Sequence, residues 1–257
     1  MTDGLQIATD AGALRVTFDR PERLNAFTAE MADRLAEEIE QVGARDGVHV
    51  VVLRGSGAAF SAGADLSGAD AHESFDVTSL DRANRIVRAI TTSPKPCVAV
   101  VNGVAAGVGC SAALACDLVV AAESASFLLA FARIGLMPDG GATATVAASV
   151  GRARAMRMAL LGEAMQAHEA YDAGLVSHLV PDADLDENAE RLVARLVAGP
   201  PLAHTATKRA VNAATLDRLE AALERERSGQ AVLLRTADAA EGMRAFAEKR
   251  RSVFRGE

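Results

Sequence analysis

The sequence of 257 residues contains no tryptophan, a single tyrosine (Tyr171) and three cysteines. A surface that stacks nucleic-acid bases needs exposed aromatic rings, so this scarcity argues against that role. Cys97, Cys110 and Cys116 lie in apolar surroundings and form neither a C-x-x-C pair nor a Cys/His ligand pattern. We therefore expect free thiols in a reducing compartment and no metal site.

Long apolar runs and a cationic N-terminal segment are also missing. No stretch approaches the roughly 20 uninterrupted apolar residues that a membrane-spanning helix needs. The N-terminal segment MTDGLQIATD has neither the cationic part nor the apolar part of a secretory signal. A net charge of −7 argues against binding to nucleic acid or to an anionic membrane. These features predict a cytoplasmic protein without nucleic-acid or membrane partners.

The most informative stretch runs from Cys97 to Ala122, with the sequence CVAVVNGVAAGVGCSAALACDLVVAA. Its first five residues are continuously apolar, which predicts a strand buried on both faces. Small residues follow, and Cys110–Cys116 reads as a short helix before a second apolar strand. A helix start leaves backbone N–H groups unpaired, and small neighbours let a ligand oxygen approach them.

A second stretch has the same character. The apolar strand Val50–Leu53 leads into GSGAAFSAGADL, another turn of mostly small residues. Two such turns could direct two N–H donors at one oxyanion, such as the enolate of a thioester. The alternative is that small residues only permit close packing at both turns.

These two turns carry a family resemblance. FSAGADL (residues 60–66) and VNGVAAGVGCSAALACDLVVA (residues 101–121) resemble the crotonase superfamily, also called the enoyl-CoA hydratase/isomerase family. RPERLNAF, RIGLMPDGGAT and GMRAFAEKRRSVF resemble further blocks of that family in the same order. The resemblance spans essentially the whole chain, and five ordered blocks are far more specific than one.

The resemblance implies an α/β fold, a spiral of repeated ββα units followed by a helical region. We expect residues 1–195 to form the core with the acyl-CoA site, and residues 196–257 to support oligomerisation and cover a pocket. The partners implied are an acyl-CoA thioester and further copies of the chain, in a homotrimer or a dimer of trimers. No separate cofactor is implied, because coenzyme A enters as part of the substrate.

The resemblance also assigns candidate site residues. The oxyanion donors are the backbone N–H groups of Ala62 and Val108. Arg23 is a candidate for the CoA phosphates, although a solvated loop arginine is an equally good interpretation. The residues implied to bind acyl-CoA are Arg23, Leu24, Ala26, Ser61, Gly63, Ala64, Asp65, Leu66, Ser111, Phe131, Phe246 and Lys249.

The acid/base groups depart from the hydratase pattern. Where hydratases of the family carry two glutamates, this sequence has Ser111 and Phe131, which cannot exchange protons with water as carboxylates do. One carboxylate remains, Asp139 in PDGGA, which resembles a P-D-x-G-G block of isomerases except that Ala142 replaces its last glycine. We predict that Asp139 is the acid/base of an enoyl-CoA isomerase. The alternative is that it only caps a helix that begins near Gly140.

Two other functions remain open. The chain could be an enoyl-CoA hydratase that positions water with Asp139 or with Glu73, which lies in a predicted loop over residues 67–77. It could also be a non-catalytic acyl-CoA carrier that has lost its acid/base pair.

Near the C-terminus, the run Glu224–Arg227 is interpreted as a solvated helix face with i,i+3 and i,i+4 charge pairing.

Overall fold

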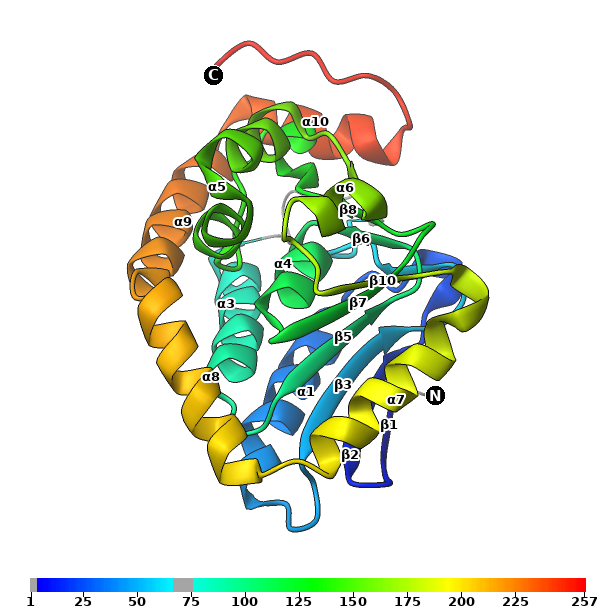
Figure 1. Cartoon of the computed structure of the whole chain (residues 1–257). Coiled ribbons are helices and arrows are strands. Elements are labelled where there is room, and N and C mark those ends of the chain that lie inside the picture. Colours follow the sequence, from blue (N-terminus) through cyan, green and yellow to red (C-terminus); the bar gives the residue numbers. More distant parts are fainter. Residues whose placement is uncertain (1–3, 67–75) are drawn as a thin grey trace.

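A six-stranded sheet forms the centre of the computed structural model, which describes residues 4–66 and 76–257 (Figure 1). Its strand order is β1-β2-β3-β5-β7-β10; β1 is antiparallel to β2, and the other neighbours are parallel. The strands are β1 (Leu5–Asp10), β2 (Ala13–Phe18), β3 (Val50–Gly55), β5 (Cys97–Val101), β7 (Leu118–Ala122) and β10 (His178–Val180). Continuous apolar strands of this kind need cover on both faces. Helix α7 (Leu185–Val197) covers one face, while α1 (Ala29–Glu40) and α3 (Val77–Thr92) lie behind the other.

A second, four-stranded sheet has the order β4-β6-β8-β9. Its strands are β4 (Ala59–Ser61), β6 (Val104–Ala106), β8 (Ser126–Leu128) and β9 (Met165–Gln166). Each of the first three comes directly after a strand of the main sheet, in the pairs β3–β4, β5–β6 and β7–β8, and they run parallel to one another. The repetition of two strands and a helix confirms the predicted spiral of ββα units.

The turn that leads into β4 is anchored by an aromatic cluster. Phe60 is fully buried, and its ring meets that of Phe18 edge to face at a centroid distance of 5.2 Å. Phe27 contacts Phe18 in the same geometry at 4.9 Å. Such pairs add about 0.5–1.5 kcal/mol to the free energy of area burial. The cluster joins three segments next to the predicted ligand-binding turns.

The helix boundaries follow local signals where those signals are strong. Thr28, a residue type that favours helix N-termini, accepts a hydrogen bond from the Met31 N–H and caps α1. The helix after the central strand, α4 (Val108–Ala115), begins two residues before the predicted Cys110. Helix α5 (Ala142–Leu161) is kinked at Gly151, whose φ of 76° and ψ of 165° are not helical, so the element consists of two helical segments on either side of this glycine.

The remaining helices form the C-terminal part and the connections. They are α6 (Ala167–Asp172), α8 (Pro201–Thr215), α9 (Leu219–Leu233), α10 (Ala237–Ala247) and the short 3-10 helices η1 (Pro21–Arg23), η2 (Gln41–Ala44), η3 (Ala130–Ile134) and η4 (Asp182–Asp184). Helix α9 packs on α3 and α5, and α10 packs on η3. The C-terminal helices therefore lie against their own core, and the division near residue 195 stays a prediction. None of the helices in the described ranges is both long and apolar enough to cross a membrane.

The three cysteines are free, and none is exposed. Burial raises the pKa of the Cys97 thiol to about 11 and that of Cys110 to about 12. Thiols with such pKa values are protonated at neutral pH and unreactive. The prediction of free thiols is confirmed, and that of burial is confirmed for Cys97 and Cys110, whereas Cys116 is half-buried.

Candidate active site

A cavity of about 740 Å³ lies between the two predicted turns, α3, η3 and α10. Its wall is mainly apolar, with side chains such as Phe27, Ile86 and Leu136, and its charged lining residues are Asp65, Arg82, Arg133 and Asp139. Ligand sites are typically apolar cavities with a few placed polar groups. The cavity is therefore the candidate ligand-binding site of the molecule.

The two small-residue turns meet at this cavity. A Cβ atom added at Gly63 would lie 2.8 Å from the Ala106 carbonyl oxygen and 3.4 Å from the Gly107 Cα, so the turns touch through their backbones. Gly63 and Gly107 also have positive φ angles of 95° and 52°. A side chain at Gly63 would push the turns apart, whereas at Gly107 the backbone conformation, with φ 52° and ψ −132°, is the reason for glycine.

Two backbone N–H groups remain available at the meeting point. Val108 is the first residue of α4, so its N–H has no acceptor within the helix. In the other turn, the N–H groups of Gly63 and Asp65 donate to the Ser61 hydroxyl and to the Phe27 carbonyl. Among the described residues, the N–H of Ala64 has no acceptor, and Ala64 and Val108 both line the cavity. The pair has the character of an oxyanion hole.

The prediction that Ala62 is the first donor is wrong. Its N–H donates to the Leu24 carbonyl at 2.8 Å, which fixes the turn against the segment after η1. A group that is committed to the backbone cannot also bind a substrate oxygen. The available donor lies two residues further along, at Ala64.

Asp139 lies in the cavity wall with only 3% of its surface exposed. Its Oδ2 accepts a hydrogen bond of 3.0 Å from Gln230 Nε2, whereas Oδ1 is buried and has no partner. Burial raises the pKa of this carboxyl to about 7; the Gln230 bond opposes the rise, and the charge of Glu226 adds to it. A carboxyl with such a pKa can both accept and return a proton at neutral pH.

Helix α5 is not capped by Asp139. Glu226 of α9 accepts from the N–H groups of Gly141 and Thr143, at 2.7 and 2.9 Å, and also from the Thr143 hydroxyl. The interpretation of Asp139 as a helix cap is therefore wrong, because Glu226 already occupies the N-terminus of α5.

Phe131 and Ser111, where the family resemblance implied the hydratase glutamates, differ in their surroundings. Phe131 lines the cavity and presents only carbon to it. Ser111 has no exposed surface, and its hydroxyl donates to the Asp139 carbonyl at 2.8 Å, behind the cavity wall. The prediction that Ser111 contacts the substrate is wrong, because its hydroxyl is turned toward the backbone of the Asp139 loop.

Comparison with known proteins agrees with this geometry. The family model described as enoyl-CoA hydratase/isomerase matches residues 8–257. The chain belongs to the enoyl-CoA hydratase/isomerase family, in the crotonase superfamily. It is 38% identical over 252 residues to the 1,2-epoxyphenylacetyl-CoA isomerase of Escherichia coli K12, with 96% of each chain covered. It is 35% identical to the 2,3-dehydroadipyl-CoA hydratase of the same strain, with 98% of each chain covered.

The solved structures of this family superpose closely on the chain. The enoyl-CoA hydratase of Mycobacterium avium subsp. paratuberculosis K-10 gives a TM-score of 0.92 at 46% identity, with 98% of each chain covered. The names of these relatives include both isomerases and hydratases. They establish an enzyme family, and the choice between the two reactions depends on the residues of this chain.

The other predicted acyl-CoA contacts of this family member divide into two groups. Those that line the cavity are Leu24, Ala64, Asp65, Leu66, Phe131 and Phe246. Arg23 and Lys249 are exposed and outside the lining, and Ala26, Ser61 and Gly63 are buried behind it. The Ser61 hydroxyl donates to the Asn25 carbonyl, so its predicted role in substrate contact is wrong and its role is to hold the turn. Glu73, which belongs to the predicted loop over residues 67–77, lies outside the described residues.

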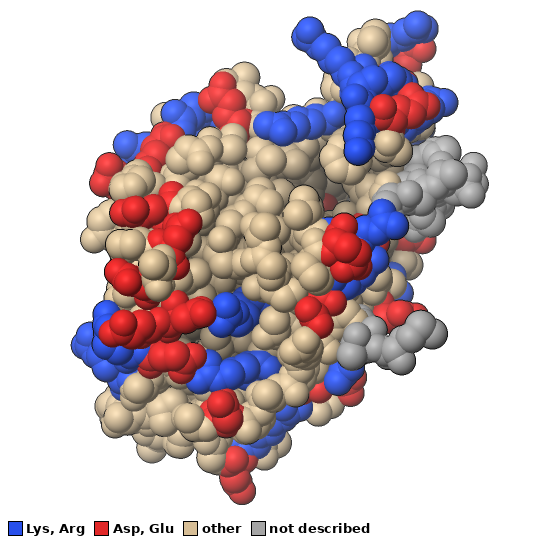
Figure 2. All heavy atoms as spheres, turned by 90° about the vertical axis from the view of Figure 1, so that its right-hand side faces the viewer, with Lys and Arg blue, Asp and Glu red and all other residues tan. Residues whose placement is uncertain are grey.

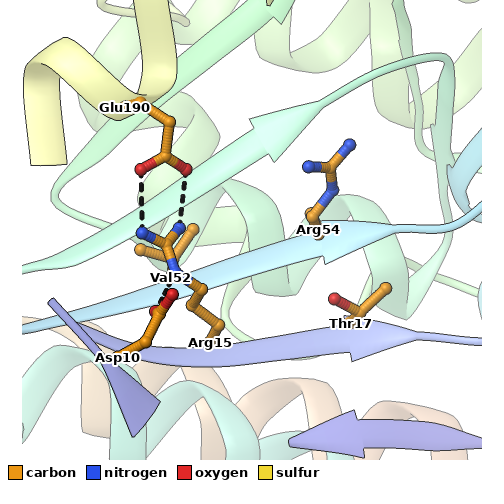
Figure 3. Close-up of a pocket in the computed structure, with 6 residues that line it drawn as sticks. All are labelled: Asp10, Arg15, Thr17, Val52, Arg54 and Glu190. Atoms are coloured by element: carbon orange, nitrogen blue, oxygen red, sulfur yellow. Dashed lines mark hydrogen bonds and ion pairs between the residues drawn. The ribbon is translucent and has the colours of Figure 1, made fainter. Parts of the chain in front are cut away.

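Another hollow, of about 300 Å³, lies on the far side of the main sheet (Figure 3). Arg15 extends between Asp10 and Glu190 and binds both carboxylates. Arg54, beside it, pairs with Asp186 at 3.0 Å. Both guanidinium groups of this hollow are therefore paired with carboxylates.

Sequence reasoning missed Glu226 and Gln230, which hold the Asp139 loop. A signal was present in the spacing of Leu219, Leu223, Glu226 and Gln230, which recur every three to four residues along α9. Two polar residues on an apolar helix stripe are expected to be buried and hydrogen-bonded. Glu226 is 1% exposed, so the interpretation of residues 224–227 as a solvated face is wrong at this position.

Proposed function

We propose that this family member is an enoyl-CoA isomerase that uses Asp139 as its single acid/base. The observation that supports it best is the unpaired, buried Oδ1 of Asp139 in the same cavity as the available N–H groups of Ala64 and Val108. The relative named as an epoxyphenylacetyl-CoA isomerase also fits this reaction class.

The proposed reaction moves one proton within the bound thioester. Oδ1 of the ionised Asp139 takes a proton from one carbon of the acyl chain, and the electron pair left behind delocalises to the thioester oxygen. The N–H groups of Ala64 and Val108 donate to that oxygen, each contributing on the order of 3 kcal/mol to transition-state stabilisation. The carboxyl then returns the proton to a different carbon, so the double bond shifts and nothing is gained or lost.

Hydration is less compatible with the same cavity. Addition of water across a double bond requires groups that orient the water and exchange its protons. Phe131 offers no polar atom, and the Ser111 hydroxyl is committed to the Asp139 carbonyl. One carboxyl against an apolar wall suits a proton transfer that excludes water.

The surface next to the cavity suits an anionic carrier group. Lys and Arg side chains gather at the end of the molecule where α10 and the C-terminal tail lie, above a largely uncharged area (Figure 2). Exposed basic residues here include Lys249, three residues after Phe246, which lines the cavity. We propose that this end receives the phosphates of coenzyme A, and that Lys249 is one contact.

The test compares wild type with Asp139→Asn on a 3-enoyl-CoA, following the appearance of the conjugated thioester absorbance. We expect the variant to lose activity by a factor on the order of 10² to 10⁴ while it still binds acyl-CoA. Asp186→Asn, which removes an exposed carboxylate on α7, is the matched control and should retain wild-type turnover.

Unchanged isomerisation by Asp139→Asn would refute the assignment. Crotonyl-CoA separates the other two functions in the same assay, because a hydratase removes its conjugated absorbance and forms 3-hydroxybutyryl-CoA. Tight binding without turnover on either substrate would indicate a carrier.

The homotrimer or dimer of trimers and the cytoplasmic location stay predictions. Exposed Leu160, Leu161 and Leu202 are apolar surface that such an assembly would bury.

A further inference from the structure

We infer that Gln230 and Glu226, one turn apart on α9, are positioning residues that keep Asp139 in its reactive orientation. Gln230 turns one carboxylate oxygen of Asp139 toward the cavity, and Glu226 occupies the helix N-terminus that would otherwise bind that carboxylate. This inference rests on the proposed role of Asp139 as acid/base.

Gln230 is fully buried and uses its whole amide on the Asp139 loop. Its Oε1 accepts from the Met137 N–H at 3.2 Å, and its Nε2 donates to the Met137 carbonyl at 2.8 Å and to Asp139 Oδ2 at 3.0 Å. The Met137 backbone offers one donor and one acceptor, so it determines which end of the amide faces which way. The group facing Asp139 is therefore an N–H donor, which holds Oδ2 and leaves Oδ1 unpartnered.

Glu226 binds the N–H groups at the start of α5, which would otherwise attract the Asp139 carboxylate. The first N–H groups of a helix attract a nearby carboxylate, and Asp139 lies three residues before Ala142, the first residue of α5. Glu226 accepts from Gly141, from Thr143 and from the Thr143 hydroxyl, so these donors are occupied. Asp139 is left with the hydrogen bond from Gln230 as its one described side-chain interaction.

The charge around Asp139 comes from few groups. Helix α9 contributes Glu226, whose negative charge disfavours ionisation of Asp139. Helices α3 and α4 face the same loop with uncharged side chains, since Val87 and Ser111 lie against Gly140. The other charged residues of the cavity wall are Asp65, Arg82 and Arg133, and none of them contributes to the shift of Asp139.

The two residues therefore act in opposite directions on the proton affinity of Asp139. Removing the Gln230 donor favours the protonated carboxyl, and removing the Glu226 charge favours the ionised one. A general base must be ionised to start the reaction, so kcat/KM falls on the acid side with the pKa of Asp139. Opposite shifts of that acid limb are a result that loss of structure alone does not produce.

The experiment measures the pH profile of kcat/KM for 3-enoyl-CoA isomerisation in full-length variants. Gln230→Met, which keeps the approximate length but not the donors, should move the acid limb up by about one pH unit. Glu226→Gln, which keeps an acceptor for the α5 N-terminus, should move it down. Glu224→Gln is the matched control, because Glu224 is exposed on the same helix and the limb should not move. The substrate phosphates titrate identically in every profile, so the comparison isolates the enzyme.

The inference is overturned if the acid limb of the kcat/KM profile stays in place in both variants, or if it moves in the same direction in both. If Gln230→Met does not fold, Glu226→Gln decides alone, and an unmoved limb overturns it. Failure of the proposed function is distinct, because Asp139→Asn would then retain isomerase activity. An inactive Asp139→Asn together with unmoved limbs would leave Asp139 catalytic and remove the positioning role of α9.

Discussion

The raised pKa of Asp139 predicts that this carboxyl lowers the stability of the folded protein at neutral and alkaline pH. Its ordinary pKa of 3.8 rises to about 7 on folding, mainly because burial removes the charged form from water. The folded protein therefore holds this proton more tightly than the unfolded chain does. The resulting loss in the free energy of unfolding is absent below the ordinary pKa and grows as the pH rises between the two pKa values. It is complete above a pH of about 7.

The magnitude follows from the two pKa values. Each pKa unit corresponds to about 1.4 kcal/mol, so the complete cost is on the order of 4 kcal/mol. Between about pH 5.5 and about pH 8.5 the cost grows by about 2 kcal/mol. Asp139→Asn keeps an acceptor for Gln230 but carries no charge at any pH. We expect its stability advantage over wild type to increase by that amount across this range.

Urea denaturation of both proteins at several pH values and one protein concentration measures the difference, since association would otherwise change the apparent stability. Asp186→Asn, at an exposed carboxylate, should give a difference that does not change with pH in this range. Intact mass checks that the new amide has not hydrolysed, because it precedes Gly140. A constant difference between Asp139→Asn and wild type across the range would refute the burial argument.

Two further predictions concern the C-terminal helices. Lys208 of α8 is buried, pairs with Asp117 at 2.8 Å and donates to the Ile90 carbonyl. Lys208→Met leaves the Asp117 carboxylate without its ion pair and should lower the free energy of unfolding by about 3 kcal/mol in urea titrations. A loss under about 1 kcal/mol would contradict this. A Cβ at Gly242 would lie 2.5 Å from the Ile134 backbone, so Gly242→Ala should push α10 away from η3. We expect the substitution to lower the free energy of unfolding by about 1–3 kcal/mol and to raise KM for acyl-CoA in initial-rate measurements. An unchanged KM would show that α10 does not support the cavity.

The sequence predicted those features that depend on neighbouring residues. The apolar runs of β5 and β7 are continuous and β-branched, and the structure has both strands at the predicted residues. The Thr28 cap also follows from a local rule, because its acceptor lies three residues before the donor it binds. The two glycine turns were located for the same reason.

Features that depend on distant segments were beyond such reasoning. Whether Ala62 or Ala64 has an available N–H is decided by the Leu24 carbonyl, which belongs to a segment 38 residues earlier in the chain than Ala62. The burial of Glu226 is decided by the packing of α9 on α5, whereas its sequence neighbours are charged. Local propensity carries no information on either contact.

The small residue at position 111 is coupled to the way Asp139 is held. A Cβ at Gly140 would lie 3.0 Å from the Ser111 Cβ, so the Asp139 loop packs directly against this small residue. A longer side chain at position 111 would have to displace that loop or turn into the cavity, and it would break the hydroxyl bond to the Asp139 carbonyl. A glutamate at position 111 would therefore disturb the carboxyl that we propose as the base before it could help to activate water. The small residue at position 111 and the buried carboxyl at position 139 form one arrangement, which suits transfer of a proton between two carbons.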